Sequence, residues 1–454
     1  MARGAKKETA LTPEEKLAQA LVPEAEQPYR VPENWRWTTI GCVSEVVTGG
    51  TPSKKHPEYY GGDFPFFKPS DLDAGRNVYE ASEYLSQEGR KVSRTIPAQA
   101  SAVCCIGSIG KCGFLMREGT TNQQINSAIP RINPLYLYYY FQTETFINEL
   151  RSKASATTIS IVNKSKMEQC CFPLSPLFEQ QRIVDRIESL FAKLDEAKEK
   201  AQAVVDGFED RKAAILHKAF TGELTEGWRE EEGIKFEDTW VQGILGDYAN
   251  NQYGYTEKST TEPLGPKFLR ITDIQNGQVI WNDVPYCKID NEQQEKYALN
   301  IGDIVVARIG ATTGKSYMVV DNVNAVYASY LIRVTIEKTS LLMSKYLYYF
   351  LDCPSYWQQI TQLSSGIAQP GVNGNKLKTL NIPVPSIDEQ EEIVRLLDCL
   401  LPIEKQSKEA AEQVIDQIET MKKAILARAF RGELGTNDPT EESAEELLKG
   451  AILQ

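Results

Sequence analysis

The sequence of 454 residues predicts an α+β protein with an internal pseudo-two-fold repeat. We expect two mixed α/β domains, separated by two long helices that pair as an antiparallel coiled coil. The stretch "FEQQRIVDRIESL" from Phe178 returns as "DEQEEIVRLLDCL" from Asp388, and "KAAILHKAFTGEL" from Lys212 returns as "KKAILARAFRGEL" from Lys422. Both pairs are 210 residues apart. The segments between them are rich in Gly and in short β-branched runs, which is typical of strands and turns.

The repeat also predicts where the domains begin and end. Upstream of the helical repeats, "WRWTTIG" from Trp35 resembles "WVQGILG" from Trp240. The predicted parts are residues 1–32 as an N-terminal extension, 33–172 as the first mixed domain, 173–233 as a central helical spacer, 234–382 as the second mixed domain, 383–435 as a C-terminal helical spacer, and 436–454 as an acidic tail.

Apolar residues in the helical parts recur at alternating three- and four-residue steps, which predicts a heptad seam. A helix of some forty residues is roughly 60 Å long, so the pair could hold two domains at a fixed separation. Pro402 is expected to kink or split the second helix, and Gly222 and Gly432 to end the two helical segments. The predicted seam residues are Ile183, Ile187, Leu190, Leu194, Ala197, Ala201, Val204 and Phe208 in the first copy, and Ile393, Leu397, Leu400, Ala411, Val414 and Ile418 in the second.

Composition excludes several classes of protein. A hydrophobic content of 41% suits a chain that buries a real core. No apolar run approaches the ~18–20 residues of a membrane helix, and the first residues show no secretory pattern. Nine cysteines without a C-x-x-C pair predict reduced thiols, a cytoplasmic protein and no zinc cage. With only two histidines, neither in a motif, we expect no metal site and no cofactor in this chain.

Two stretches imitate enzyme motifs. "RIGATTGKSY" from Arg308 resembles a phosphate-binding loop, but Gly310 and Gly314 are separated by three residues where that loop needs four. Its flanks predict two strands, and the other copy has "IGSIGK" there, so a hairpin turn explains both copies better. "NPLY" from Asn133 imperfectly resembles an adenine methyltransferase motif, and we expect it to cap the helix that follows. A nucleotide hydrolase and a single-chain methyltransferase are therefore the rival enzyme interpretations.

Net charge is unevenly distributed along the chain. The total is −12, but residues 33–172 carry +2 and residues 234–382 carry −1, whereas residues 173–233 carry −5 and residues 383–454 carry −8. The two mixed domains are thus near neutral and could each present a local basic face. Because this charge is modest for a DNA-binding protein, we infer that a partner would supply much of any phosphate neutralisation.

Taken together, these motifs resemble the specificity subunit of type I restriction–modification enzymes. The resemblance rests on the duplicated "P-x-x-x-x-[FD]-E-Q-[QE]-x-I-V" from Pro173 and Pro383, the "KAFTGEL" and "RAFRGEL" helix ends, and the paired Gly–Lys turns. It implies that the mixed domains are target-recognition domains, each for one half of a split, asymmetric DNA site. It further implies that the helices set the gap between the halves, and that the terminal pieces close a circular arrangement.

The same resemblance implies the partners. They are double-stranded DNA, two modification subunits that carry S-adenosylmethionine and methylate adenine at N6, and two restriction subunits that use ATP and Mg. The chain itself would be non-catalytic. A coiled-coil assembly scaffold without DNA readout remains the alternative.

Base readout needs polar and basic side chains on exposed loops. For each candidate the alternative is a solvated loop residue, and Asp71 and Asp273 could instead be buried acceptors in turns. The candidates are Thr51, Ser53, Lys54, Lys55, Lys68, Ser70, Ser108, Lys111, Asn122, Gln123 and Gln124 in the first domain, and Tyr253, Tyr255, Lys258, Arg270, Thr272, Arg308, Thr312, Thr313 and Lys315 in the second.

Overall fold

The computed structural model describes residues 12–155, 160–275, 277–364 and 371–453. The chain divides into two compact units: unit 1 is Met1–Ala201 with Gln413–Gln454, and unit 2 is Gln202–Glu412. The boundaries fall within both long helical segments. Each unit therefore holds the start of one helical repeat and the end of the other. The finer division into six segments stays a prediction.

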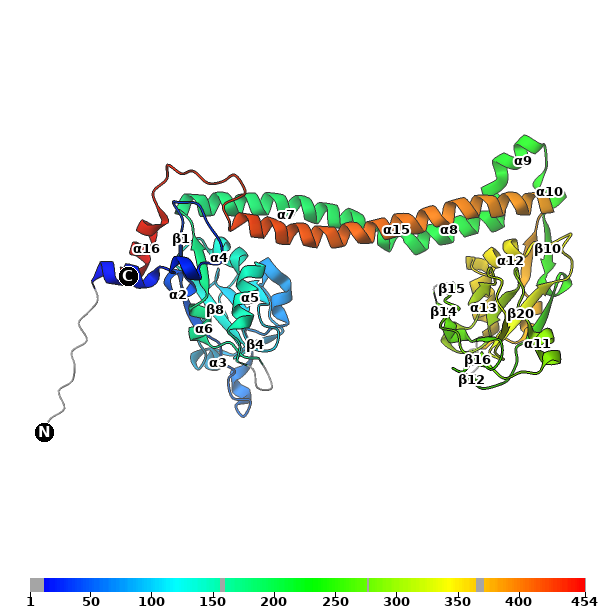
Figure 1. Ribbon diagram of the computed structural model, residues 1–454, viewed down its shortest axis with the longest axis horizontal. Helices are drawn as coiled ribbons and strands as arrows, with labels where there is room; N and C mark the ends of the chain where they lie inside the picture. The colour runs from blue at the N-terminus through cyan, green and yellow to red at the C-terminus, as the bar shows by residue number, and fades with distance from the viewer. Residues whose placement is uncertain (1–11, 156–159, 276, 365–370, 454) are drawn as a thin grey trace. The chain divides into compact units, whose positions relative to one another are not determined.

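Unit 1 combines short strands with helices on their flanks (Figure 1). Its described elements are α1 (Pro13–Ala20), η1 (Glu24–Glu26), β1 (Arg36–Thr39), α2 (Ile40–Val43), β2 (Ser44–Thr48), η2 (Pro57–Tyr59), β3 (Tyr60–Phe67), η3 (Asp71–Asn77), β4 (Glu83–Leu85), α3 (Gln87–Lys91), β5 (Ser101–Cys104), β6 (Cys112–Phe114), β7 (Thr120–Thr121), β8 (Ile125–Pro130), α4 (Pro134–Phe141), α5 (Glu144–Ser152), α6 (Lys164–Glu168), β9 (Cys171–Leu174), the first part of α7 (Leu177–Asp206), the last part of α15 (Ile387–Ala429), and α16 (Ala444–Leu453).

The described strands of unit 1 form three small sheets. The largest is antiparallel with the order β2-β8-β5-β6. A second has the order β4-β3-β7, in which β3 and β7 are parallel. The third pairs β1 with β9, so that Arg36 faces Leu174 at the point where the chain enters α7. This last pair joins the two ends of the mixed domain.

The core of unit 1 contains side chains from both ends of the chain. Tyr136 and Tyr140 of α4 contact the ring of Phe430, which follows α15. Ala444 and Leu448 of α16 are fully buried in the same core. Helices α1 and α16 lie side by side (Figure 1). The N-terminal and C-terminal segments therefore meet in one core, and the segment predicted as an acidic tail carries a packed helix.

Unit 2 repeats this plan with different loops. Its described elements are the last part of α7, α8 (Phe208–Thr221), η4 (Glu223–Thr225), α9 (Glu226–Glu232), α10 (Phe236–Thr239), β10 (Val241–Ile244), η5 (Leu245–Asp247), β11 (Ala249–Tyr253), β12 (Ser259–Thr260), β13 (Lys267–Leu269), η6 (Ile271–Asp273), β14 (Ile274–Gln275), β15 (Gln278–Val279), β16 (Tyr286–Cys287), α11 (Asn291–Tyr297), β17 (Ile304–Ala307), η7 (Gly310–Thr312), β18 (Ser316–Met318), β19 (Ala325–Tyr327), β20 (Leu331–Ile336), α12 (Ser344–Phe350), α13 (Pro354–Ser364), α14 (Gly374–Lys378), β21 (Asn381–Val384) and the first part of α15.

The main sheet of unit 2 has the order β11-β20-β17-β18, the counterpart of β2-β8-β5-β6 in unit 1. A second sheet has the order β12-β16-β13-β19, and β14 pairs with β15. Strands β10 and β21 pair as β1 and β9 do. In the core, Phe220 of α8 packs on Tyr346 and Phe350 of α12. The predicted α+β fold with an internal repeat is confirmed.

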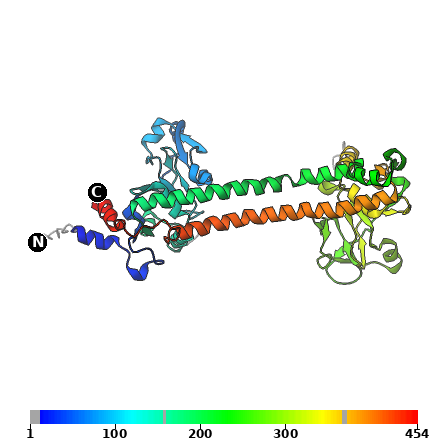
Figure 2. The same ribbon diagram turned by 90° about the horizontal axis from the view of Figure 1, so that it is seen from above.

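The long helices pack in opposite directions within each unit. In unit 1, Asp195 of α7 pairs with Lys422 of α15, and Lys198 pairs with Glu419 at 2.6 Å. Partner numbers fall on α15 as they rise on α7, which defines an antiparallel pair (Figures 1 and 2). In unit 2, Arg211 of α8 bonds Glu404 of α15 at 2.7 Å.

The interruption in the helices is not where the sequence predicted it. α15 runs unbroken from Ile387 to Ala429 through Pro402, so the predicted split at this proline is wrong. Pro402 is exposed, and at an exposed site water can serve the carbonyl that loses its N–H partner. The other repeat is interrupted instead, at Gly207 between α7 and α8, where the Arg211 guanidinium donates to the carbonyl of Val204 at 2.9 Å.

Burial along the predicted seam is greatest where the helices meet the mixed domains. Ile183 and Ile187 are fully buried in the core of unit 1, and Ile393 and Leu397 in that of unit 2. Two predicted seam residues, Ala197 and Val414, are exposed and lie off the packed face. Of the rest, Ala411 and Ile418 are buried, and Leu190, Leu194, Ala201, Val204, Phe208 and Leu400 are half-buried.

Within the described part of the chain, no helix has the length and apolarity needed to cross a membrane.

Candidate nucleic-acid interface

The repeated Glu–Gln pair at the start of each long helix fixes the helix against its domain. Both glutamines are fully buried. The amide oxygen of Gln180 accepts the backbone N–H of Asn133 at 3.0 Å, and that of Gln390 accepts the N–H of Met343 at 2.9 Å. These N–H groups stand at the starts of α4 and α12, where a helix has no internal acceptors. The motif that revealed the repeat is thus a structural joint.

The paired glutamates have different partners in the two units. The Glu179 carboxylate accepts the indole N–H of Trp35 at 2.7 Å and the amide N–H of Asn437 at 2.9 Å. Burial raises the pKa of Glu179 above its usual range. Glu389 instead forms an ion pair with Arg229 and accepts the hydroxyl of Thr225 at 2.6 Å.

In unit 1, two loops that carry predicted DNA contacts lie together. A Cβ on Gly49 would be only 2.1 Å from the carbonyl oxygen of Asn122, so the close approach requires glycine. Thr51 donates to the side chain of Gln123 across this contact. The Asn122 amide donates to the side chain of Gln124 at 3.0 Å and so orients it. The adjoining predicted residues Ser53, Lys54 and Lys55 are exposed on the same loop as Thr51.

The remaining candidates of unit 1 lie on two other turns. Lys68 pairs with Glu83 at 2.9 Å, and Asp71 accepts the backbone N–H of Lys68 at 2.7 Å, as the turn-acceptor alternative predicted. Ser70 is exposed in that turn. Ser108 and Lys111 line a hollow of about 630 Å³ beside α5. Lys111 also pairs with Asp73 at 2.7 Å.

In unit 2, the structure brings Tyr253 and Arg308 together. The guanidinium of Arg308 lies 5.3 Å from the ring centroid of Tyr253, a cation–π contact. The hydroxyl of Tyr253 accepts the backbone N–H of Gly374 at 2.8 Å, which fixes the ring. Tyr255, two residues on, is half-buried, and Lys258 is exposed.

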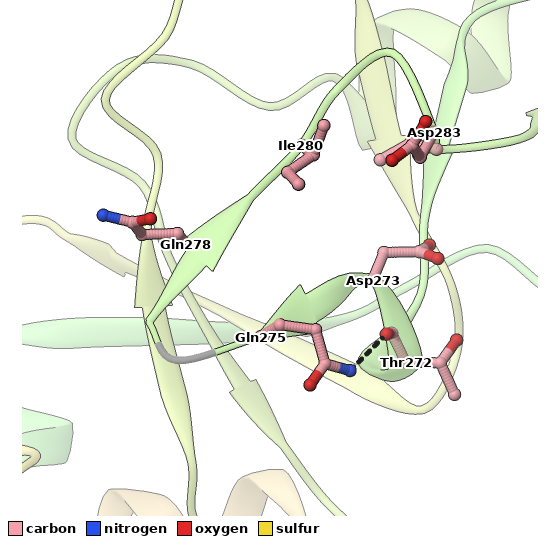
Figure 3. Close-up of a pocket in the computed structure, with 7 residues that line it drawn as sticks. Thr272, Asp273, Gln275, Gln278, Ile280 and Asp283 are labelled. Carbon is pink, nitrogen blue, oxygen red and sulfur yellow. Dashed lines mark hydrogen bonds between the residues drawn. The ribbon is translucent and has the colours of Figure 1, made fainter. Parts of the chain in front are cut away.

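Arg270 and Thr272 belong to a turn that fixes the arginine. The Asp273 carboxylate accepts the backbone N–H of Arg270 at 2.8 Å and also pairs with its guanidinium at 2.7 Å. Asp273 is therefore a turn acceptor, like Asp71. Thr272 lines a hollow of about 370 Å³, in which Gln275 donates to the carbonyl of Thr272 at 2.8 Å (Figure 3).

The Gly–Lys stretch of unit 2 is the turn of a hairpin, as predicted. β17 and β18 pair antiparallel on either side of it, so it is not the strand-to-helix turn of a nucleotide-binding loop. Gly314 has φ +91, and a Cβ there would meet Trp357 of α13 at 3.0 Å. Thr312 and Lys315 line a hollow of 810 Å³ beside that helix, whereas Thr313 is buried and donates to the Gly310 carbonyl at 2.7 Å.

Ion pairing separates the basic candidates into two groups. Lys68, Lys111 and Arg270 are already paired with carboxylates. Among the described residues, no carboxylate pairs with Lys54, Lys55, Lys258, Arg308 or Lys315. An exposed ion pair is worth only ~0–1 kcal/mol, so the paired group could still turn to a phosphate. The unpaired group could bind a phosphate without such an exchange.

The structure adds one residue that the sequence did not suggest. The backbone N–H of Arg308 donates to the carbonyl of Tyr330 at 3.1 Å, and the side chain of Tyr330 is 52% exposed. No local motif marks Tyr330, because it joins the site only through the pairing of strands distant in sequence.

Within the described ranges, no cluster of three or more His, Cys, Asp or Glu side chains could hold a metal ion.

Comparison with known proteins gives concordant results. The family model described as "Type I restriction modification DNA specificity domain" matches the chain twice, over residues 32–205 and 238–413. The chain is 23% identical over 442 residues to the type I restriction enzyme EcoKI specificity subunit of Escherichia coli K12, covering 89% of this chain and 90% of that one. It is 24% identical over 431 residues to the MjaVIII specificity subunit of Methanocaldococcus jannaschii, covering 89% and 94%.

Two solved structures share the fold. A chain from work titled "Structural basis underlying complex assembly and conformational transition of the type I R-M system" aligns with a TM-score of 0.70 and 19% identity. The crystal structure of the HsdS subunit from Thermoanaerobacter tengcongensis aligns with a TM-score of 0.62 and 20% identity. Each alignment covers 90% of this chain and 100% of the other.

Proposed function

This chain belongs to the type I restriction–modification DNA specificity family, and from that premise we propose how its parts share the work. It is a specificity subunit with two DNA specificity domains. Each domain reads one half of a bipartite DNA site, and the two halves differ in sequence. One observation carries this proposal: the two units share a backbone plan but place different side chains on it, which suits a protein that reads two unlike sequences.

The helical segments set the gap between the two half-sites. This proposal is supported by the continuity of α15, a helix of 43 residues that enters both units. Opposite packing of the helices within each unit and the ion pair between Lys198 and Glu419 support a coiled-coil spacer. A helix of fixed length would fix the spacing of two half-sites. The same helices dock two modification subunits.

Catalysis belongs to the partner subunits. S-adenosylmethionine binds to the modification subunits, which methylate adenine at N6, and two restriction subunits use ATP and Mg. The net charge of −12 supports this division, because a chain so acidic releases few counterions from DNA by itself. Nine free thiols and a DNA substrate support a cytoplasmic location. The match of both domains to a DNA specificity model favours DNA readout over a scaffold without readout.

Footprinting of the assembled complex tests this proposal. The chain is combined with its modification subunit and a DNA fragment that carries one methylated site, and hydroxyl-radical cleavage is recorded on both strands. We expect two protected stretches of unlike sequence at a constant separation. Protection of one continuous stretch would contradict the spacer role, and uniform cleavage with an intact complex would contradict DNA readout.

A further inference from the structure

The same backbone frame surrounds Cys105 in unit 1 and Arg308 in unit 2. Both residues follow the strand that precedes the Gly–Lys turn, β5 or β17. Four backbone hydrogen bonds of unit 1 have counterparts in unit 2. In unit 1 the N–H groups of Cys105, Val162, Cys104 and Gly50 donate to the carbonyls of Gln124 (2.7 Å), Cys105 (2.9 Å), Lys111 (2.8 Å) and Thr121 (2.9 Å). In the same order in unit 2, the N–H groups of Arg308, Val372, Ala307 and Tyr255 donate to the carbonyls of Tyr330 (3.1 Å), Arg308 (2.8 Å), Lys315 (2.8 Å) and Tyr327 (2.8 Å).

A matching pair of glycines extends the frame to the neighbouring strand. A Cβ on Gly49 would lie 2.1 Å from the carbonyl oxygen of Asn122. A Cβ on Gly254 would lie 2.3 Å from the carbonyl oxygen of Ala328. The residues just before them, Thr48 and Tyr253, therefore occupy equivalent positions. The lysine of the turn is retained in both units, whereas the side chains around position 105 or 308 are not.

The side chains on this frame differ in chemical class between the units. Unit 2 carries a guanidinium and phenol rings, whereas unit 1 carries small or amide side chains. The pairs, unit 1 first, are Thr48 and Tyr253, Gly50 and Tyr255, Cys105 and Arg308, and Gln124 and Tyr330. Cys105 is 2% exposed, and burial raises the pKa of its thiol to about 12, so this position is neutral in unit 1.

The environment of Arg308 leaves one edge of its guanidinium available. Its Nε is enclosed and has no partner among the described residues. The ring of Tyr253, fixed by its own bond to Gly374, supports the guanidinium plane. The two Nη groups likewise have no hydrogen-bond or ion-pair partner in the described part of the chain, and they are not enclosed. An arginine fixed in this way offers two parallel N–H donors and loses little conformational freedom on binding.

We propose that Arg308 is a base-reading residue of unit 2 and that it binds guanine in one G·C pair of that unit's half-site. The two Nη groups would donate to O6 and N7 of guanine, the acceptor pair that the major groove presents for this base. Unit 1 has no donor at the equivalent position, so this position contributes to the difference between the half-sites. The inference rests on the proposed function, because it requires that unit 2 reads DNA.

Methylation mapping of variants tests the proposal. The wild-type chain and the Arg308→Lys and Arg308→Gln variants are each expressed with the modification subunit in a host without adenine methylation, and N6-methyladenine is mapped across the genome. We expect the wild-type motif to contain a G·C pair in the half-site of unit 2. In both variants, discrimination at that pair should fall by roughly 5- to 150-fold, the value of one bidentate contact. The other half-site should keep its sequence.

Arg308→Lys separates the donor geometry from the charge, because lysine keeps a positive charge on a long stem but lacks the planar fork. It also serves if Arg308→Gln assembles poorly. Lys288→Gln is the matched control: Lys288 is an exposed cation of the same unit outside the frame, and its loss should leave the motif unchanged.

The possible outcomes are distinct. A wild-type split motif that both Arg308 variants retain, with methylation lowered at all sites, would overturn the base-reading role and leave a phosphate or packing role. Relaxation at an A·T pair would overturn the choice of guanine. A wild-type complex that methylates no split motif would overturn the proposed function itself, and the inference with it.

Discussion

At the scale of single residues, the internal repeat keeps a glutamate at the start of each long helix but gives it different partners in the two units. Glu179 and Glu389 occupy the same place in their helices and are both fully buried. The first is held by neutral N–H donors of Trp35 and Asn437, and the second by the guanidinium of Arg229. Burial raises the pKa of Glu179, because removing a carboxylate from water disfavours its charged form. The folded and unfolded chains should therefore differ in the pKa of this group.

Glu179→Gln tests this difference. Burial raises the pKa of Glu179 in the folded chain above its value near 4.3 in the unfolded chain. Between these two values the folded chain binds more protons than the unfolded one, so this group lowers the free energy of unfolding as pH rises through that window. Above the folded pKa the loss is constant. The free energy of unfolding of the wild type minus that of the variant should fall with rising pH and then level off.

Denaturant unfolding at a series of pH values from about 4 to 7 measures this difference. Glu433→Gln, the same substitution at an exposed position, is the control. A difference that grows with pH for Glu179→Gln would show that the neutral donors lower the pKa of this carboxyl more than burial raises it.

Single residues also show how far the candidate site could be predicted. Asp71 and Asp273 recur at equivalent positions in the sequence, and that recurrence was enough to suggest turn acceptors. The pairing of Arg270 with Asp273 could not be predicted, because a three-residue spacing does not fix a guanidinium. The contact between Arg308 and Tyr253 joins two strands 55 positions apart, and only strand pairing brings such residues together. The contribution of each candidate to DNA binding stays a prediction.

At the scale of elements, the helical repeat could be predicted and its interruption could not. Repeated apolar spacing predicted both helical repeats, because periodicity is a local property of the sequence. Their antiparallel pairing was implied by the family resemblance. The split predicted at Pro402 is absent, because the proline is accommodated within α15. Its cost depends on whether water reaches the carbonyl left without a partner, and this depends on exposure in the folded chain. α7 ends at Asp206, and there the later Arg211 donates to the Val204 carbonyl, a contact that no local motif predicts.

Pro402→Ala tests the cost of this proline. Alanine restores the missing N–H and removes the steric strain, so the variant should be more stable by about 1–3 kcal/mol, up to the full propensity difference. The measurement is the free energy of unfolding by denaturant. Ser407→Ala, at another exposed position of α15, controls for helix propensity and should give a gain of well under 1 kcal/mol. No gain for Pro402→Ala would contradict this account and mean that the proline costs the helix no stability at this position.

At the scale of the whole molecule, the domain plan followed from sequence, but the composition of each core did not. The duplication predicted two mixed domains and two helices. The structure shows that the core of unit 1 also takes Phe430 and Leu448 from the far end of the chain. The acidic composition of residues 436–454 hid this packing, because the buried Leu448 is close in sequence to the charged residues Glu445, Glu446 and Lys449. Each domain is thus completed by the end of the opposite helical repeat.

The central claim, that one chain reads two unlike half-sites at a fixed spacing, is tested most directly by one measurement. The wild-type chain is expressed with its modification subunit in a host that lacks adenine methylation, and N6-methyladenine is mapped across the genome. We expect a single motif with two short defined halves of different sequence around a gap of constant length. Methylation of a continuous motif, or no methylation despite a stable complex that contains this chain, would contradict the claim.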